Sequence, residues 1–244
     1  MARTPEGAQL TRAHHRNQNR LRSATLRDLL VLWQSVEPTD LARTIGRFTA
    51  AATVLVRERN RESSALAAAY FRGFRAAEGI PGSVTPRTAE VPHSARIAAA
   101  VRGSALSGII NARKAGFSPQ AAARNGFVKA SGKTTKLVLD GSRETLRLSG
   151  RSDRQAARWQ RVTSGEPCWW CAMLASRGPV FLSEESGGFE AHDHCACEPE
   201  IVYDGSQMTD EARQYRELWD SVRDPRDSHR SRVNFRRAIE GRAE

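Results

Sequence analysis

The stretch that decides the C-terminal part of the fold lies between Pro167 and Pro199 and holds all four cysteines of the chain. It reads Pro167-Cys168-Trp169-Trp170-Cys171, then twenty residues, then His192-Asp193-His194-Cys195-Ala196-Cys197. Two thiols three positions apart can turn toward one ion, and a second pair of soft ligands completes a tetrahedral zinc site. The spacing C-x2-C-x20-H-x2-C-x-C therefore predicts a structural zinc centre.

More side chains compete for this ion than it can bind, since zinc takes about four ligands. Cys168 and Cys171 form the first pair. His192 and Cys195 repeat the same spacing, and Cys197 shares a face with Cys195 if the segment is extended. The predicted metal ligands are Cys168, Cys171 and two or three of His192, Cys195 and Cys197, and His194 is the remaining candidate. No nearby carboxylate is placed as a general base, which favours a structural ion over a catalytic one.

The cysteine pattern allows three other interpretations. Four cysteines allow three disulfide pairings, but no apolar leader follows Met1, and we therefore expect no export to an oxidising compartment. Residues 167–171 match the P-C-x-x-C half of a zinc deaminase. The H-x-E half is absent, because none of His14, His15 and His93 has a Glu two residues later. The third interpretation, a cluster of buried thiols without a metal, remains an alternative to the zinc centre.

The segment from Val162 to Gly178, which contains the C-x-x-C and a following Leu174, and the later H-D-H-C-A-C at 192–197 resemble a phage family. They are similar to the C-terminal region of phage minor head proteins of the Mu F-like head morphogenesis family, in the form carried by actinobacteriophages. The family pattern ends in H-P-N-C-R-C or a close variant. Here Asp193, His194 and Ala196 replace the Pro, Asn and Arg.

This resemblance covers roughly residues 155–203, about a fifth of the chain. It implies a minor structural component of the capsid interior that associates with the portal protein and the capsid proteins. Such a protein acts in procapsid assembly and in DNA packaging or ejection. It is located in the virion, and in the host cytoplasm during assembly.

The N-terminal two thirds of the chain show helical periodicity. The first expected helix covers residues 6–36. The second begins at Leu41, continues or restarts near Glu62 and ends at 79–82. Further helices are expected at residues 97–114 and at residues 133–149, with a short helix between them from Ser118 to Gly126. Apolar positions in the second helix recur at three- and four-residue steps, as in the core of a helical hairpin or bundle.

After Ala156 the sequence pattern changes from that of helices to that of short strands. Strands are expected at 158–163, 180–182 and 198–203. Thr209 is expected to cap a helix that Pro225 ends. The tail from 227 to 242 is either a last helix or a mobile basic arm. The predicted class is α+β, mostly helical with a small β-rich Cys/His module, and the predicted domains are 1–82, 83–154, 155–206 and 207–244.

A net charge of +11, from 38 basic and 27 acidic residues, favours contact with polyanions. The densest basic stretches are 129–154 and the tail after Arg223. Predicted contacts to nucleic acid are Lys133, Lys136, Arg143, Arg147, Arg230, Arg232, Arg236 and Arg237. No row of aromatic residues accompanies them, so we expect binding without sequence preference. No apolar stretch is long enough to span a membrane.

Enzymatic motifs fail in this sequence, and we expect no catalytic role and no small-molecule substrate. Gly132-Lys133-Thr134 resembles the end of a phosphate loop, but Phe127 stands where its first Gly is required. No G-x-S-x-G is present. His93 and Ser94 are adjacent, and neighbours seldom face each other productively. The alternatives to a minor head protein are a capsid maturation protease and a zinc-containing nucleic-acid-binding protein.

Overall fold

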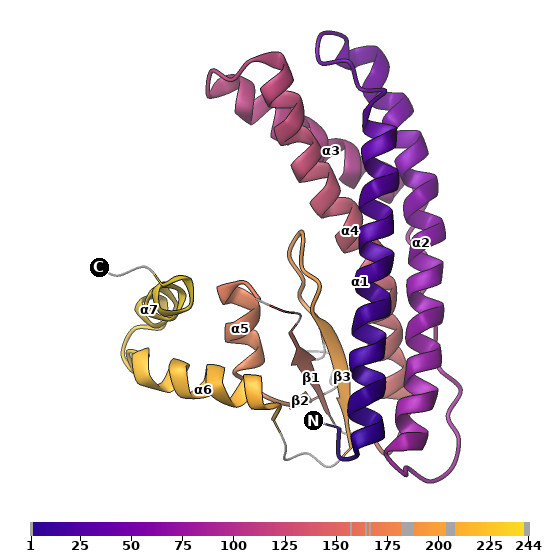
Figure 1. Cartoon of the computed structure of the whole chain (residues 1–244), viewed down its shortest axis with the longest axis vertical. Helices are drawn as coiled ribbons and strands as arrows, with labels where there is room; N and C mark the ends of the chain where they lie inside the picture. Colours follow the sequence, from indigo (N-terminus) through magenta and orange to yellow (C-terminus); the bar gives the residue numbers. More distant parts are fainter. Residues whose placement is uncertain are drawn as a thin grey trace.

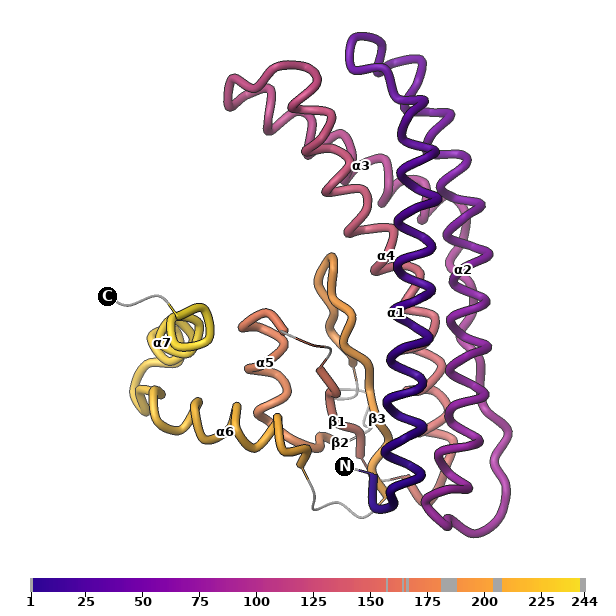
Figure 2. The backbone as a smooth tube through the Cα atoms, viewed as in Figure 1, coloured from indigo at the N-terminus to yellow at the C-terminus, as the bar shows by residue number. Residues whose placement is uncertain are grey.

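A computed structural model of the chain describes residues 2–156, 158–163, 165, 167–181, 188–203 and 208–241. Its largest part is a bundle of the long helices α1 (Pro5–Trp33), α2 (Leu41–Ala77), α3 (Ser94–Lys114) and α4 (Pro119–Ser152). In Figure 1, α1 and α2 run side by side along the whole length of the bundle. The backbone trace in Figure 2 shows the hairpin of α3 and α4 leaning away from them at one end.

Local sequence explains where these helices begin. Thr4 accepts a hydrogen bond from the backbone of Gly7 and Ser118 accepts one from Ala121, and a proline follows each of these caps. Most of the apolar stripe expected in the second helix is buried: Ile45, Phe48 and Ala52 are at most 2% exposed, and Leu41 and Leu55 are partly buried against the same core. The same helix runs through Glu62 without a break.

The structure corrects the prediction for α4, which is one helix where two were expected. Gly126 does not end a helix, because it lies where α4 crosses α3. A Cβ atom on Gly126 would stand 2.5 Å from Ile109 and 3.0 Å from the carbonyl oxygen of Ala105. Gly108 makes the reciprocal approach, since its Cβ would stand 2.6 Å from the carbonyl oxygen of Asn125. These glycines allow the two backbones to touch.

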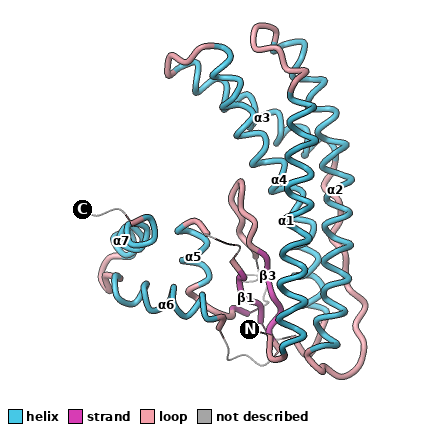
Figure 3. Tube along the Cα trace, viewed as in Figure 1, coloured by secondary structure: helices cyan, strands magenta, loops and turns pink. Residues whose placement is uncertain are grey.

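The strands fall where the sequence predicted them, as β1 (Arg158–Val162), β2 (Val180–Phe181) and β3 (Glu198–Val202). They form an antiparallel sheet in the order β2-β1-β3, with Trp159 opposite Ile201. Figure 3 shows how small this sheet is beside the helices. The chain is therefore mostly helical with a small sheet, as predicted.

The sheet lies against the bundle. Trp159 and Ile201 share a buried cluster with Phe71, Phe74 and Leu146 of α2 and α4. The α1–α4 bundle has a common core of its own. The predicted domain boundaries after residues 82, 154 and 206 stay predictions.

Three short helices complete the described chain: α5 (Trp169–Ala175), α6 (Asp210–Val222) and α7 (Ser228–Glu240). The sequence did not predict α5. The tail takes the helical alternative as α7, because Phe235 is fully buried against Met173 and Trp219. Among the described helices, none has the length and apolar character that crossing a bilayer demands.

Candidate metal centre

The two halves of the Cys/His spacing converge on one place. Cys168 stands directly before α5 and Cys171 lies in its first turn. Cys195 and Cys197 lie in the extended segment that leads into β3. All four cysteines are free thiols, and Cys171, Cys195 and Cys197 are buried while Cys168 is exposed. His192 enters from the loop before β3, so that all five predicted ligands meet.

These donor atoms form two groups that share Cys171. The sulfurs of Cys168 and Cys171 lie with a ring nitrogen of His192 within 4.8 Å of one another, and the sulfurs of Cys171, Cys195 and Cys197 do the same. Separations of 2.7 Å from Cys168 Sγ to His192 Nε2, 3.7 Å from that nitrogen to Cys171 Sγ and 3.5 Å from Cys171 Sγ to Cys195 Sγ link four of the donors. Tetrahedral zinc with bonds of about 2.3 Å to sulfur separates its ligands by about 3.8 Å. The separations at Cys171 are close to that value, whereas Cys168 Sγ and His192 Nε2 lie closer together. The donor types fit zinc, and a bound ion would move Cys168 and His192 apart.

The His192 ring is held in the orientation that a ligand needs. Its Nδ1 donates a hydrogen bond to the carbonyl oxygen of Asp193 at 2.7 Å, which leaves Nε2 turned toward the thiols of Cys168 and Cys171. A metal-bound imidazole usually donates its other nitrogen in this way. His192 is therefore the histidine of the candidate site.

His194 lies outside both groups. It has a positive φ of 68°, and a Cβ on Gly132 of α4 would stand 2.5 Å from its Nε2. The neighbouring Asp193 forms an ion pair with Lys133 of α4 at 2.8 Å. The glycine thus lets the ligand loop lie directly on α4, and His194 serves that contact.

Two buried guanidinium groups support the sulfurs. Arg143 of α4 donates to the carbonyl oxygens of Cys195 at 2.8 Å and Cys197 at 3.1 Å. Arg161 of β1 donates to the sulfur of Cys171 at 3.9 Å. Both stack over the ring of Phe189, with centroid distances of 5.3 and 3.9 Å. Positive charge beside thiols favours the thiolate form that binds metals.

The sulfurs also perturb one another. The pKa of Cys168 is lowered to about 5, first because Cys171 donates a hydrogen bond to it and then because His192 contributes a hydrogen bond and positive charge. Hydrogen bonds from Cys171 and Cys197 also lower the pKa of Cys195, and the charge of Arg143 adds to this effect. The pKa of Cys171 is raised, because its proton is shared with the other thiols and it is buried. The lowered pKa values of Cys168 and Cys195 favour the thiolate form that binds metals.

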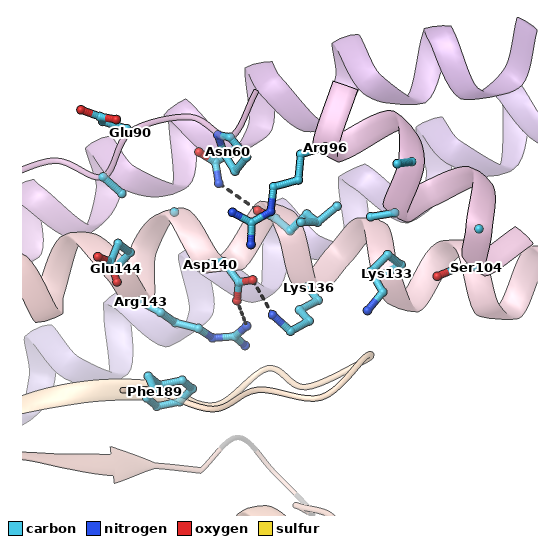
Figure 4. Close-up of a pocket in the computed structure, with 17 residues that line it drawn as sticks. Asn60, Glu90, Arg96, Ser104, Lys133, Lys136, Asp140, Arg143, Glu144 and Phe189 are labelled. Atoms are coloured by element: carbon cyan, nitrogen blue, oxygen red, sulfur yellow. Dashed lines mark hydrogen bonds and ion pairs between the residues drawn. The ribbon is translucent and has the colours of Figure 1, made fainter. Parts of the chain in front are cut away.

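The predicted nucleic-acid contacts on α4 are occupied within the fold. Figure 4 shows Asp140 between Lys136 and Arg143, with ion pairs of 2.6 and 3.0 Å. Arg147 pairs with Glu144 at 2.5 Å. Lys136, Asp140, Arg143 and Glu144 line a hollow of about 850 Å³ that carries both acidic and basic side chains. Arg143 is 2% exposed, which places it out of reach of a phosphate backbone.

The predicted contacts on α7 are exposed but not free. Arg230 approaches Asp224 at 4.0 Å, and Arg236 pairs with Glu240 at 2.9 Å. Arg232 donates to the carbonyl oxygen of Ser228 at 3.2 Å, and Arg237 also has an interaction partner. The positive charge of Arg230 and Arg236 is thus partly balanced, by Asp224 in the loop before α7 and by Glu240 on α7.

A buried polar network escaped sequence analysis. Glu198 and Glu200 of β3 are 1% and 2% exposed. Ser142 donates to Glu198 at 2.7 Å and lies 3.1 Å from His14 Nε2, and Thr11 donates to Glu200 at 2.6 Å. The available signal was the polar row Thr11, His14 and Gln18 at helical spacing in α1, which is buried.

Comparison with known proteins finds a family model and a phage protein that are similar to this chain. A family model described as VG15 protein matches residues 6–222. The Gene 15 protein of Mycobacterium phage D29 is 41% identical over 66 residues, which are 22% of this chain and 24% of that protein. The match thus spans about a quarter of that relative. No solved structure matches the chain. A phage relationship is supported, and neither match specifies the Mu F-like head morphogenesis family.

Proposed function

This chain belongs to the VG15 protein family, and on that premise we propose that it is a virion-associated phage protein and a minor component of the head. In this proposal it acts in procapsid assembly from the capsid interior, where it contacts the portal and capsid proteins. The similarity to a mycobacteriophage gene product supports the phage setting. The resemblance of the Cys/His segment to minor head proteins supports the role in the head.

The observation that carries a structural role is the type of ligand that the Cys/His module offers to a metal. Its candidate ligands are thiols and one imidazole, and no described Asp or Glu joins either group. Cys168, Cys171, His192 and Cys195 would hold the ion, and Cys197 would stand beside them. A bound zinc ion would supply a crosslink between α5 and the segment before β3, where metal-binding energy becomes folding energy.

The surface proposed to contact the portal or capsid lies toward the end of the bundle far from this module. Exposed apolar side chains occur there on α1, on α3 and α4, and on the turn between α3 and α4. They are Leu30, Val31, Ile110, Phe117 and Val128, each about half exposed or more. Contiguous exposed apolar patches mark surfaces that another protein covers, and we propose that these side chains belong to one such surface.

Coexpression with the portal protein of the same phage tests this proposal. We expect the full chain to copurify with portal rings and to appear in purified procapsids by mass spectrometry. Replacing Val31 and Phe117 by Glu should reduce incorporation, because charge on a buried interface is costly. A matched variant with Glu at the exposed polar positions Gln9 and Gln214 should incorporate normally. Wild-type protein absent from procapsids would contradict the proposal.

We also propose that the chain is not an enzyme. Among the described residues, Ser142 with His14 and Glu198 comes nearest to a hydrolytic arrangement, but Ser142 is 0% and His14 4% exposed, so a substrate could not reach them. His93 caps α3 by accepting from the backbone of Ala95, and Ser94 accepts from Arg57. Incubation with unprocessed capsid protein should leave that protein uncut, and specific cleavage would favour the protease alternative.

A further inference from the structure

A row of arginines follows one face of α1. Arg12, Arg16, Arg20 and Arg27 are spaced by four, four and seven residues, and all four are exposed. A helix rises about 6 Å over four residues, so the row extends for about 22 Å from Arg12 to Arg27. The opposite face of the same helix is buried in the bundle through residues such as Leu21 and Leu29. The row is therefore displayed on a rigid support.

These guanidinium groups have no acidic partner. None of the four forms an ion pair or a side-chain hydrogen bond with a described residue. Asp28, the acid next to Arg27, pairs instead with Arg59 of α2 at 3.1 Å. The charge of the row is thus available to a ligand, unlike the charge of Lys136 and Arg147 on α4, which acidic neighbours neutralise.

The row also borders a shallow groove with an unusual lining. Its volume is about 340 Å³, and its lining residues are Arg16, Asn19, Arg20, Ser23 and Arg27. Every one of these side chains can donate hydrogen bonds, and none is acidic or apolar. Arg, Asn and Ser are residue types that commonly contact phosphate oxygens in protein–DNA complexes.

We propose that this face of α1, the α1 arginine row, binds the sugar-phosphate backbone of double-stranded DNA without sequence preference. The inference rests on the proposed function in one respect, since packaged DNA is the polyanion inside a phage head. A membrane surface fits less well, because the groove offers no apolar side chain for insertion. A protein partner fits less well for the same reason, because the centre of a protein interface is usually apolar.

The test compares two variants of the full chain that lose the same charge. One carries Arg16→Gln, Arg20→Gln and Arg27→Gln. The matched control carries Lys136→Gln, Arg147→Gln and Arg236→Gln, which remove three cations with partners inside the fold. Both bind a labelled DNA duplex of two unrelated sequences across a salt series, and fluorescence anisotropy gives Kd. Circular dichroism and zinc content confirm that each variant is folded.

We expect the wild type to bind both duplexes equally, with a Kd that rises steeply with salt. The variant of the α1 arginine row should bind at least tenfold more weakly at low salt, and its salt slope should fall by about three. The control should stay near the wild type. If both variants bind DNA equally weakly, the effect is one of net charge alone and the inference is overturned. If the wild type binds no DNA, the inference is likewise overturned, and an acidic protein surface becomes the partner to test. Incorporation into procapsids is measured separately, so a protein that assembles without binding DNA refutes this inference alone.

Discussion

Arg143 Nη2 donates a hydrogen bond to the carbonyl oxygen of Cys195 at 2.8 Å, across 52 positions of sequence. The guanidinium group comes from the middle of α4, and the carbonyl belongs to a candidate metal ligand. This contact joins the helical bundle to the Cys/His module and sets the position of the segment that leads into β3. The bundle is therefore part of the candidate metal centre.

Replacing Arg143 by Gln should weaken the centre without touching a ligand. Loss of charged hydrogen bonds of this kind costs about 1.5–3 kcal/mol of unfolding free energy. Removing an outer-shell partner typically lowers metal affinity about 10–100-fold. Chelator competition measures the affinity, and denaturant unfolding measures the stability. Arg147→Gln, one turn along α4 and partly exposed, is the matched control and should change stability by less than about 0.5 kcal/mol. Equal effects of the two substitutions would refute the role given to Arg143.

Cys171→Ser should abolish zinc binding, whereas Cys197→Ser should retain it. Cys171 is the sulfur shared by both donor groups, and it lies near His192 Nε2 and Cys195 Sγ. Elemental analysis of protein purified without chelator gives the stoichiometry. Trp169 and Trp170, whose rings meet edge to face at 5.7 Å, should report loosening of α5 by fluorescence. A wild-type zinc content near zero would contradict the metal assignment, and metal loss in Cys197→Ser would move the fourth ligand to that residue.

Two glycines of α3 should respond to alanine in opposite directions. Gly103→Ala should raise stability by about 0.5–1 kcal/mol, because nothing lies within 4 Å of the new Cβ and glycine is a poor helix former. Gly108→Ala should lower stability by about 1–3 kcal/mol, because its Cβ would stand 2.6 Å from the carbonyl oxygen of Asn125 and would overpack the helix crossing. Thermal or urea unfolding of both variants decides this. A stabilised Gly108→Ala protein would contradict the close crossing of α3 and α4.

Stability should fall as the pH drops below 6.5, in part because of His15. Burial lowers the pKa of His15 below its ordinary value of 6.5, although Glu198 opposes this shift, and its Nε2 is buried without a hydrogen-bond partner. The unfolded chain therefore binds a proton at this residue before the folded chain does, so acid favours unfolding. Urea unfolding on either side of pH 6.5 should show a smaller pH dependence in His15→Gln than in the wild type. Zinc content is followed in both proteins, since acid also releases metals from thiolates.

Sequence alone predicted the elements whose signals are local. The start of a helix at Ser118-Pro119, the apolar steps of α2 and the strand at β3 are read within a few residues, and the structure has these elements in place. The spacing of Cys168 with Cys171 and of His192 with Cys195 likewise predicted that these side chains would converge. Such patterns suffice because helix and strand periodicity place neighbouring side chains on a face without reference to the rest of the chain.

Tertiary structure decided what the charged and small residues do. Gly126 and Gly132 read as a helix end and a failed phosphate loop, but each allows a close approach, one to α3 and one to the ligand loop. Arg143 was predicted to contact nucleic acid, whereas it is buried and donates to the carbonyl oxygen of Cys195. Arg12, Arg16, Arg20 and Arg27 recur at helical spacing in the sequence, and the structure shows that no described acid pairs with them. The carbonyl partners of Arg143 lie 52 and 54 positions away in sequence, and only the folded arrangement of α4 and the ligand loop brings them to it.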